Sequence, residues 1–363
     1  MSTLTELERR TPPNARTMRN YLFVGLSIAL FSLLALLLSL LALLSLPPQD
    51  SAKSPDYLSQ ITRDGASNWY RDFGGRYVPE IQDQDIFYSN VGSSVAAAKN
   101  ADIVLLGPSF VSYAIDRDTL RASTPLSQLK IYNMAFVGIR GGEFSRRVIE
   151  RWSIRAPLWV INVDDQFVHF FSSDLNVTLG PQKTPVDAIR RNRLRGYLTA
   201  TRRNLRWRFE DMLAMLRDGH FSQTGIYRNI EDGDMAVDVN PAYLADNNKP
   251  MLSERGQQCH IDPEVIDYAR AFLNAIGGHA VLTLVPHSQS CRGQAAELAK
   301  ALDVELITPP FDGLTTVDGG GHLDRNGARI FTSYLARELV KTVAFRRVFA
   351  GRMGDLNQKP ELQ

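Results

Sequence analysis

Residues 103–109 read IVLLGPS, an apolar run followed by Gly107, Pro108 and Ser109. A short apolar run that contains β-branched residues and stops at Gly or Pro is typical of a buried strand. Four later runs share this pattern, at 129–136 (LKIYNMAF), 158–163 (LWVINV), 280–286 (AVLTLVP) and 304–310 (VELITPP). We therefore expect five core strands.

Stretches with helical patterning separate these strands. They lie at 142–154, 263–276, 293–303 and 324–341. Strands that alternate with helices imply βαβ crossovers, a mostly parallel sheet and helices on both of its faces. The prediction is an α/β protein whose domain, residues 70–345, has a three-layer α/β/α, flavodoxin-like fold. In such sheets, functional sites gather outside the carboxyl ends of the strands.

The amino-terminal part has a different composition. Residues 21–46 (YLFVGLSIALFSLLALLLSLLALLSL) contain no charged residue, no Pro and one Gly. About 20 apolar helical residues cross the ~30 Å hydrocarbon core of a bilayer. A cleaved signal peptide has a shorter apolar region and a small-residue cleavage site. We expect one uncleaved transmembrane helix at 21–46, with a tail at 1–20 and a linker at 47–69. After the domain we expect a C-terminal tail at 346–363.

Basic residues flank the predicted span unequally, with four before it and two closely after it. They are Arg9, Arg10, Arg16 and Arg19 before it, and Lys53 and Arg63 after it. Cytoplasmic flanks of membrane spans carry an excess of Lys and Arg. This bias predicts a cytoplasmic N-terminus and a domain on the outer side of the membrane.

The formal net charge of +2 points to no polyanionic partner, and we expect no nucleic acid to bind. Cys259 and Cys291 are the two cysteines, which excludes a disulfide-dense scaffold. Cys259 precedes the helix at 263 and Cys291 follows the strand at 280. Both positions fall at one edge of the sheet, so we expect a disulfide, with two unpaired thiols as the alternative. His169, His260 and His287 have no ligand-like spacing with Cys or acidic residues, so we expect no metal site.

A basic insertion, about 166–250, interrupts the strand–helix pattern and contains helical pieces near 185–196 and 199–217. Its arginines include Arg190, Arg191, Arg193, Arg195, Arg202, Arg203, Arg206 and Arg208. Such a run is usually a solvated helical face. The alternative is contact with anionic head groups or an anionic glycan.

Three segments at predicted strand ends carry chemically useful side chains. Ser109 follows the first strand, Asp164 and Asp165 end the third, and Asp318 and His322 precede the last helix. A Ser hydroxyl becomes a nucleophile when a base lies within hydrogen-bond reach and a carboxylate orients that base. Ser109, His322 and Asp318 supply these three groups. The alternatives are a turn Ser, a capping or core His, and acids that cap helices or form ion pairs.

With these residues, the sequence resembles the SGNH (GDSL-type) hydrolase superfamily over roughly residues 100–345. It is most similar to the membrane-anchored members of bacterial polysaccharide O-acetylation and teichoic-acid D-alanylation systems. The blocks that carry the resemblance are ADIVLLGPSFVSYAID and GGGHLDRNGARIFTSYLAREL. The resemblance implies an SGNH-like domain with Ser109 as nucleophile and His322 as catalytic base. It implies an oxyanion hole from Ser109, Gly138, Asn162 and Asp164.

Three positions depart from the family pattern. Pro108 stands where Asp or Ser is usual, and Asp318 lies four residues before His322 instead of three. Asp164 takes the place of the Asn that donates to the oxyanion. An ionised carboxylate there repels developing negative charge, and loss of one oxyanion donor costs about 3–4 kcal/mol.

The resemblance implies an O-acyl(acetyl)transferase or esterase that acts on a cell-surface glycan without a cofactor. It also implies a bacterial inner-membrane location, with the domain in the periplasm or outside the cell. The implied partners are the lipid bilayer, the glycan and a membrane-bound acyl-transfer protein. One alternative is a non-catalytic anchored scaffold or glycan-binding subunit. Another is a lipid-facing accessory subunit that uses the arginine helices.

Overall fold

The computed structural model describes residues 23–35, 37, 68–73, 87, 93–136, 142–167, 225–238, 249–250, 260–288, 290–317 and 320–356. The chain divides into two compact units, Met1–Lys53 and Ser54–Gln363. In the first unit, residues 23–35 are helical. Within the described ranges, no helix combines the length and the apolar character needed to cross a membrane. Residues 21–22, 36 and 38–46 of the predicted span lie outside these ranges.

A five-stranded parallel sheet forms the centre of the second unit. Its spatial order is β3 (Ile131–Asn133), β2 (Ile103–Leu106), β4 (Leu158–Asn162), β8 (His279–Thr283) and β9 (Glu305–Ile307). Counted along the chain within this sheet, the order is 2-1-3-4-5, as in flavodoxin-like sheets. The prediction of an α/β protein with five mostly parallel strands is confirmed. In this order the switch point, where ligands bind, lies between β2 and β4.

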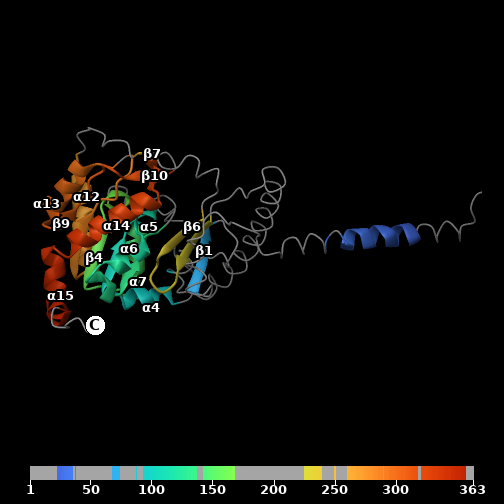
Figure 1. Ribbon diagram of the computed structural model, residues 1–363, viewed down its shortest axis with the longest axis horizontal. Helices are drawn as coiled ribbons and strands as arrows, with labels where there is room; N and C mark the ends of the chain where they lie inside the picture. Colours follow the sequence, from blue (N-terminus) through green and yellow to red (C-terminus); the bar gives the residue numbers. More distant parts are fainter. Residues whose placement is uncertain are drawn as a thin grey trace, which may run out of the picture. The chain divides into compact units, whose positions relative to one another are not determined.

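Helices cover both faces of this sheet (Figure 1). One face packs against α4 (Ser94–Lys99), α7 (Gly142–Trp152), α12 (Pro263–Ile276) and α13 (Arg292–Leu302). The other packs against α5 (Ser109–Ala114), α6 (Arg117–Ala122), α14 (Arg325–Leu339) and α15 (Val343–Leu356).

The side chains of β2 alternate between the two apolar clusters, one on each face of the central sheet. Val104 and Leu106 belong to the first apolar cluster, whereas Ile103 and Leu105 belong to the second. Successive side chains of a strand point to opposite faces, so a strand between two helical layers is apolar throughout. This explains why the run at 103–106 has no polar residue.

Local signals set the bounds of α12, which coincide with the predicted helix at 263–276. Asp262 caps the helix by accepting a hydrogen bond from Glu264 N, and Pro263 occupies the first turn. Pro fits there because the first helical N–H groups have no intrahelical partner. Gly277, with φ of +66°, ends the helix in a conformation that favours glycine.

Two smaller antiparallel sheets flank the central one. The first contains β1 (Trp69–Phe73), β5 (Gly225–Asn229) and β6 (Met235–Asp238). The second contains β7 (Lys249–Pro250), β10 (Thr315–Val317) and β11 (His322–Leu323). Within the predicted insertion at 166–250, the described residues include β5, β6 and β7, and the expected helical pieces near 185–196 and 199–217 lie outside the described ranges. The linker predicted at 47–69 was one residue too long, because Trp69 is buried and begins β1.

Arg228 joins the β5–β6 hairpin to the edge of the central sheet. Its buried guanidinium donates to the carbonyl oxygens of Asn133 at 2.8 Å and Gly233 at 3.0 Å, and also to that of Ala135. Asn133 N in turn donates to Asp232 O at 2.7 Å. The hairpin is therefore fixed at the carboxyl end of β3.

The C-terminal prediction was wrong in part. We expected a tail at 346–363, but Val343–Leu356 forms α15. Phe345 and Phe349 are buried in the second apolar cluster, with ring centroids 4.8 Å apart. Burial of these two rings attaches α15 to the domain.

Candidate active site

Ser109 lies at the turn between β2 and α5, beside the switch point of the sheet. β2 ends at Leu106, and Ser109 is the first residue of α5. A Cβ atom on Gly107 would lie 2.4 Å from Val111 Cγ2 and 3.0 Å from Asn162 Cβ. Only a residue without a side chain fits here, so Gly107 permits the tight turn that presents Ser109.

His322 approaches Ser109 from the other end of the domain sequence. It lies on β11, where it pairs with Val317 of β10. Two residues later, Asp324 caps α14 through a 2.8 Å hydrogen bond from Gly327 N, and Thr315 Oγ1 donates to the same carboxylate oxygen at 2.6 Å. A strand pair and a helix cap therefore fix the backbone on both sides of His322.

The hydroxyl and the imidazole are in hydrogen-bond contact. His322 Nε2 lies 2.9 Å from Ser109 Oγ, although the residues are 213 positions apart. The ring of Tyr113 lies 4.2 Å from the imidazole, centroid to centroid, and that of Phe110 lies 5.2 Å from it. This is the geometry in which an imidazole can accept the proton of a Ser nucleophile.

A second imidazole lies beside this pair. His287 Nε2 is 2.9 Å from Asp164 Oδ2, and both side chains are largely buried. The His287 ring stacks on Phe110, with centroids 4.0 Å apart and planes 6° apart. Asp164, predicted either at the oxyanion or in an ion pair, therefore contacts a histidine.

Asn162 provides a polar side chain at the end of β4. It is fully buried, and its Oδ1 accepts a hydrogen bond from Val285 N at 2.8 Å. Its Nδ2 has no hydrogen-bond partner among the residues the structure describes. Asn162 Cβ borders the Gly107 turn, so a buried amide donor lies next to the segment that carries Ser109.

Several predicted site residues lie outside the described ranges. They are Asp318, Gly138, Cys259 and the insertion arginines, including Arg190, Arg191, Arg193, Arg202, Arg203 and Arg206. Cys291 is disulfide-bonded, and the sequence contains one other cysteine. Its pairing with Cys259 stays a prediction.

Sequence reasoning missed His287. It follows β8 on the same edge of the sheet as Ser109, and this placement was the available signal. No group of three or more His, Cys, Asp or Glu within the described ranges could hold a metal ion.

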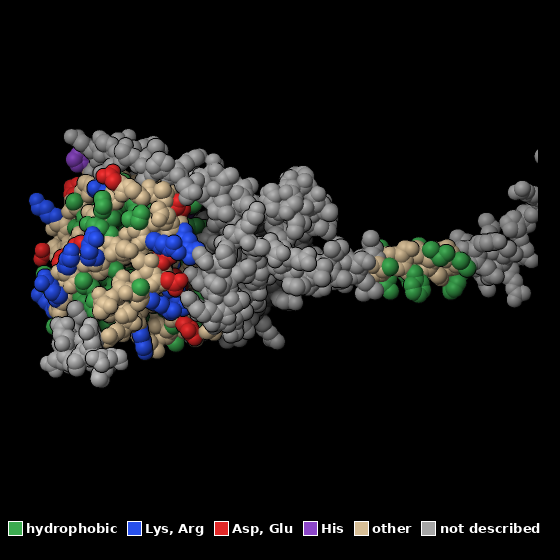
Figure 2. Space-filling view, viewed as in Figure 1, with side chains coloured by type: hydrophobic (Ala, Val, Ile, Leu, Met, Phe, Trp, Pro, Cys, Tyr) green, Lys and Arg blue, Asp and Glu red, His purple; other side chains and the backbone are tan. Residues whose placement is uncertain are grey.

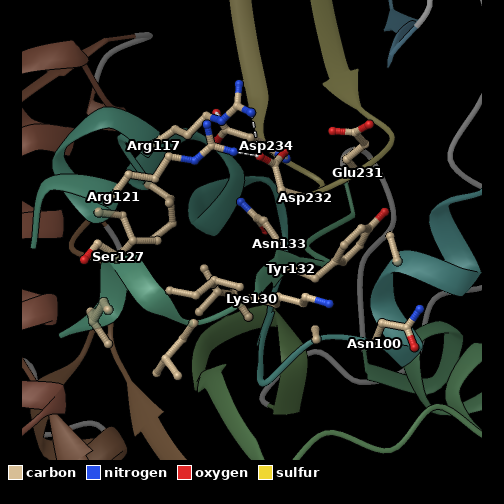
Figure 3. Close-up of a pocket in the computed structure, with 18 residues that line it drawn as sticks. Asn100, Arg117, Arg121, Ser127, Lys130, Tyr132, Asn133, Glu231, Asp232 and Asp234 are labelled. Atoms are coloured by element: carbon tan, nitrogen blue, oxygen red, sulfur yellow. Dashed lines mark hydrogen bonds and ion pairs between the residues drawn. The ribbon is translucent and has the colours of Figure 1, made fainter. Parts of the chain in front are cut away.

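A cavity of about 550 Å³ has neither Ser109 nor His322 in its lining, which includes Arg117, Arg121 and Asp232 (Figure 3). Arg117 and Arg121 of α6 both contact Asp232 at its wall, at 2.8 and 2.7 Å. Burial raises the pKa of Asp234 well above its usual range, and the nearby Asp232 carboxylate adds to this effect while Arg117 opposes it. These contacts join α6 to the turn between β5 and β6.

The fold and the contacts define a parallel α/β protein with a Ser–His pair at the switch point of its sheet. Comparisons with protein-family models, with curated proteins and with solved structures found no match.

Proposed function

We propose that this protein is an acyl-ester enzyme, an O-acyl(acetyl)transferase or esterase of the SGNH type, which acts on a cell-surface glycan. The observation that carries the proposal is the 2.9 Å contact between Ser109 Oγ and His322 Nε2. The position of Ser109 after β2, at the switch point, adds support because ligands bind there in flavodoxin-like sheets.

The reaction would proceed through an acyl-enzyme. Ser109 Oγ attacks the acyl carbonyl carbon of the donor while His322 Nε2 takes the hydroxyl proton. The bond to the leaving oxygen then breaks, and His322 returns the proton to that oxygen. In the second half, His322 deprotonates a glycan hydroxyl or water, which attacks the acyl carbonyl carbon. The bond from that carbon to Ser109 Oγ breaks, and His322 returns the proton to Oγ. No cofactor is needed, because Ser109 carries the acyl group.

Two further roles complete the proposed site. Asn162 Nδ2 would donate to the oxyanion, supported by its burial without a described partner beside the Gly107 turn. Gly138 would contribute a second donor, and Asp318 would orient His322, as the family resemblance implies. The contact of Asp164 with His287 favours Asn162 as the oxyanion donor. The imidazole binds the Asp164 carboxylate, whose negative charge would otherwise repel the oxyanion.

We also propose that residues 21–46 anchor the domain in the bacterial inner membrane, with the domain on its outer side. In the described part of this segment, Phe23 and Phe31 are 73% and 74% exposed, and the other large apolar side chains are exposed too (Figure 2). A helix that is apolar all round is favoured in lipid. The bilayer would bring the domain close to a membrane-bound acyl-transfer protein, and the insertion arginines would contact anionic groups.

The experiment is active-site labelling with a fluorophosphonate probe, which reacts with activated Ser hydroxyls. The wild-type chain should be labelled at Ser109, whereas Ser109→Ala and His322→Ala should abolish labelling about equally, because the two residues act as a unit. Ser127→Ala, at an exposed position of η2 (Leu126–Gln128), is the matched control and should be labelled normally.

A non-catalytic scaffold is the second candidate, favoured by Asp164 in place of the oxyanion Asn. It predicts no labelling of the folded wild-type chain and unchanged glycan acylation in cells that carry the Ser109→Ala variant. Either result would overturn the enzyme proposal.

A further inference from the structure

We propose that His287 and Asp164 form a positioning pair for the Ser109–His322 site. The pair would hold Phe110 and the loop before His322, and through them the distance between hydroxyl and imidazole. This inference rests on the proposed function, because it concerns the reactivity of Ser109.

The first link is the contact between His287 and Asp164. The side chains are 8% and 13% exposed, and the joining distance is 2.9 Å. A buried carboxylate or imidazole without a partner is costly, so each group stabilises the placement of the other. Ser290 adds support, since its hydroxyl accepts from His287 N at 2.8 Å and donates to Val285 O at 3.1 Å.

The second link is the stack of His287 on Phe110. The two rings are almost parallel, with centroids 4.0 Å apart. Phe110 directly follows Ser109, and its ring also lies 5.2 Å from that of His322. Phe110 therefore contacts both imidazoles, and a shift of His287 removes packing from the residue next to the nucleophile.

The third link runs through the backbone. Ser288 N donates to Gly320 O at 2.9 Å, which ties the residue after His287 to the turn two residues before His322. Gly320 has φ of +93°, and a Cβ atom there would lie 3.3 Å from Ser288 Cβ. The loop after β8 and the turn before β11 therefore pack tightly, so His287 acts on both members of the Ser–His pair.

These links assign His287 a positioning role and not a catalytic one. Its Nε2 contacts Asp164, and the Ser109 hydroxyl already has an imidazole partner in His322. Misplacing reacting groups by about 1 Å can cost roughly 100-fold in rate. Loss of the pair should therefore slow the reaction of Ser109 without removing the groups that react.

The test measures the maximal rate and the half-saturating concentration for fluorophosphonate modification of Ser109 in the full chain. The variants are His287→Phe, which keeps an aromatic ring but loses the hydrogen bond, and Asp164→Ala, which removes the acceptor. Asp164→Asn keeps an acceptor oxygen and serves as the conservative variant. His260→Phe, at an exposed histidine, is the matched control.

We expect His287→Phe and Asp164→Ala to lower the maximal rate by about 10- to 100-fold, with a half-saturating concentration within about twofold of wild type. Asp164→Asn should recover most of the rate, and His260→Phe should match wild type. Thermal unfolding identifies the folded variants. If His287→Phe does not fold, the comparison of Asp164→Ala with Asp164→Asn decides the question.

Two results would overturn the inference, and they are distinguishable. A labelled wild type with folded variants that react at the wild-type maximal rate removes the positioning role and leaves the proposed function intact. A folded wild type that is not labelled at Ser109 removes the proposed function, and the inference with it.

Discussion

At Gly107 the chain passes between Val111 and Asn162 with no room for a side chain. Gly107→Ala would place a Cβ atom 2.4 Å from Val111 Cγ2, so neighbouring atoms must move. We expect this change to lower the free energy of unfolding by about 1–3 kcal/mol, as overpacking of a core does. It should also reduce labelling of Ser109, which lies two residues further on. Urea denaturation and probe labelling measure the two effects.

A double-mutant cycle with Val111→Ala tests the cause. Val111→Ala removes the nearer clashing atom, so the two changes together should cost less than the sum of each alone. We expect a coupling energy of at least about 0.5 kcal/mol. Additive effects would show that contact with Val111 is not the source of the strain.

The sequence allowed Ser109 and His322 to be placed together, but not His287 with Asp164. The first pair follows from the rule that loops at the carboxyl ends of parallel strands share an edge. Asp164 and His287 lie 123 positions apart. Which of several strand-end side chains meet depends on rotamers and on the stack with Phe110, and no spacing along the chain encodes these contacts.

Among the elements, local sequence signals located α12 and the strands of the central sheet better than they located α15 and the β5–β6 hairpin. α12 has an Asp cap, an initial Pro and a final Gly, and its predicted bounds are those of the structure. α15 has an N-cap, because Thr342 Oγ1 accepts from Phe345 N at 3.2 Å, and the Glu305 carboxylate also accepts from Val343 N and Ala344 N. It lacks a clear apolar stripe, and it is attached to the domain by burial of Phe345 and Phe349. The β5–β6 hairpin was not predicted, because the arginine-rich segment before it led to the whole region being interpreted as a helical insertion.

The contact between α6 and the β5–β6 turn should contribute strongly to stability. Arg117 is 6% exposed and contacts Asp232, which is 16% exposed. Arg117→Met leaves buried carboxylates without this partner and should cost about 3–5 kcal/mol. Arg121 contacts the same carboxylate but is 54% exposed, so Arg121→Met should cost less than about 1 kcal/mol. Equal losses in urea denaturation would contradict this difference in burial.

Asp234 should make stability depend on pH. Burial raises its pKa in the folded protein, so the stability it contributes is fully present below the unfolded pKa of about 3.9 and is lost as pH rises through the folded value. Relative to wild type, Asp234→Asn should therefore gain stability as the pH rises above about 4. Unfolding in urea at several pH values measures this gap. A gap that shrinks as pH rises would refute the assignment, and Asp267→Asn, at an exposed carboxylate, is the control.

At the scale of the whole molecule, charge and hydropathy separate two kinds of segment. On the face of the larger unit shown in Figure 2, basic and acidic side chains are interspersed. This agrees with the formal net charge of +2. The helical residues 23–35 expose apolar side chains instead. The larger unit, Ser54–Gln363, has its own core, so it should fold without the first 53 residues.

The predicted anchor then determines on which side of the membrane that unit lies. Four arginines precede residue 21, whereas Lys53 and Arg63 alone follow residue 46 closely, which favours a cytoplasmic N-terminus. A protease added to spheroplasts should therefore digest the chain beyond about residue 60. A chain that begins at Ser54 and carries no export signal should be protected in the same cells, because it would remain in the cytoplasm. Protection of the full chain, with digestion restored after the membrane is permeabilised, would reverse the predicted orientation.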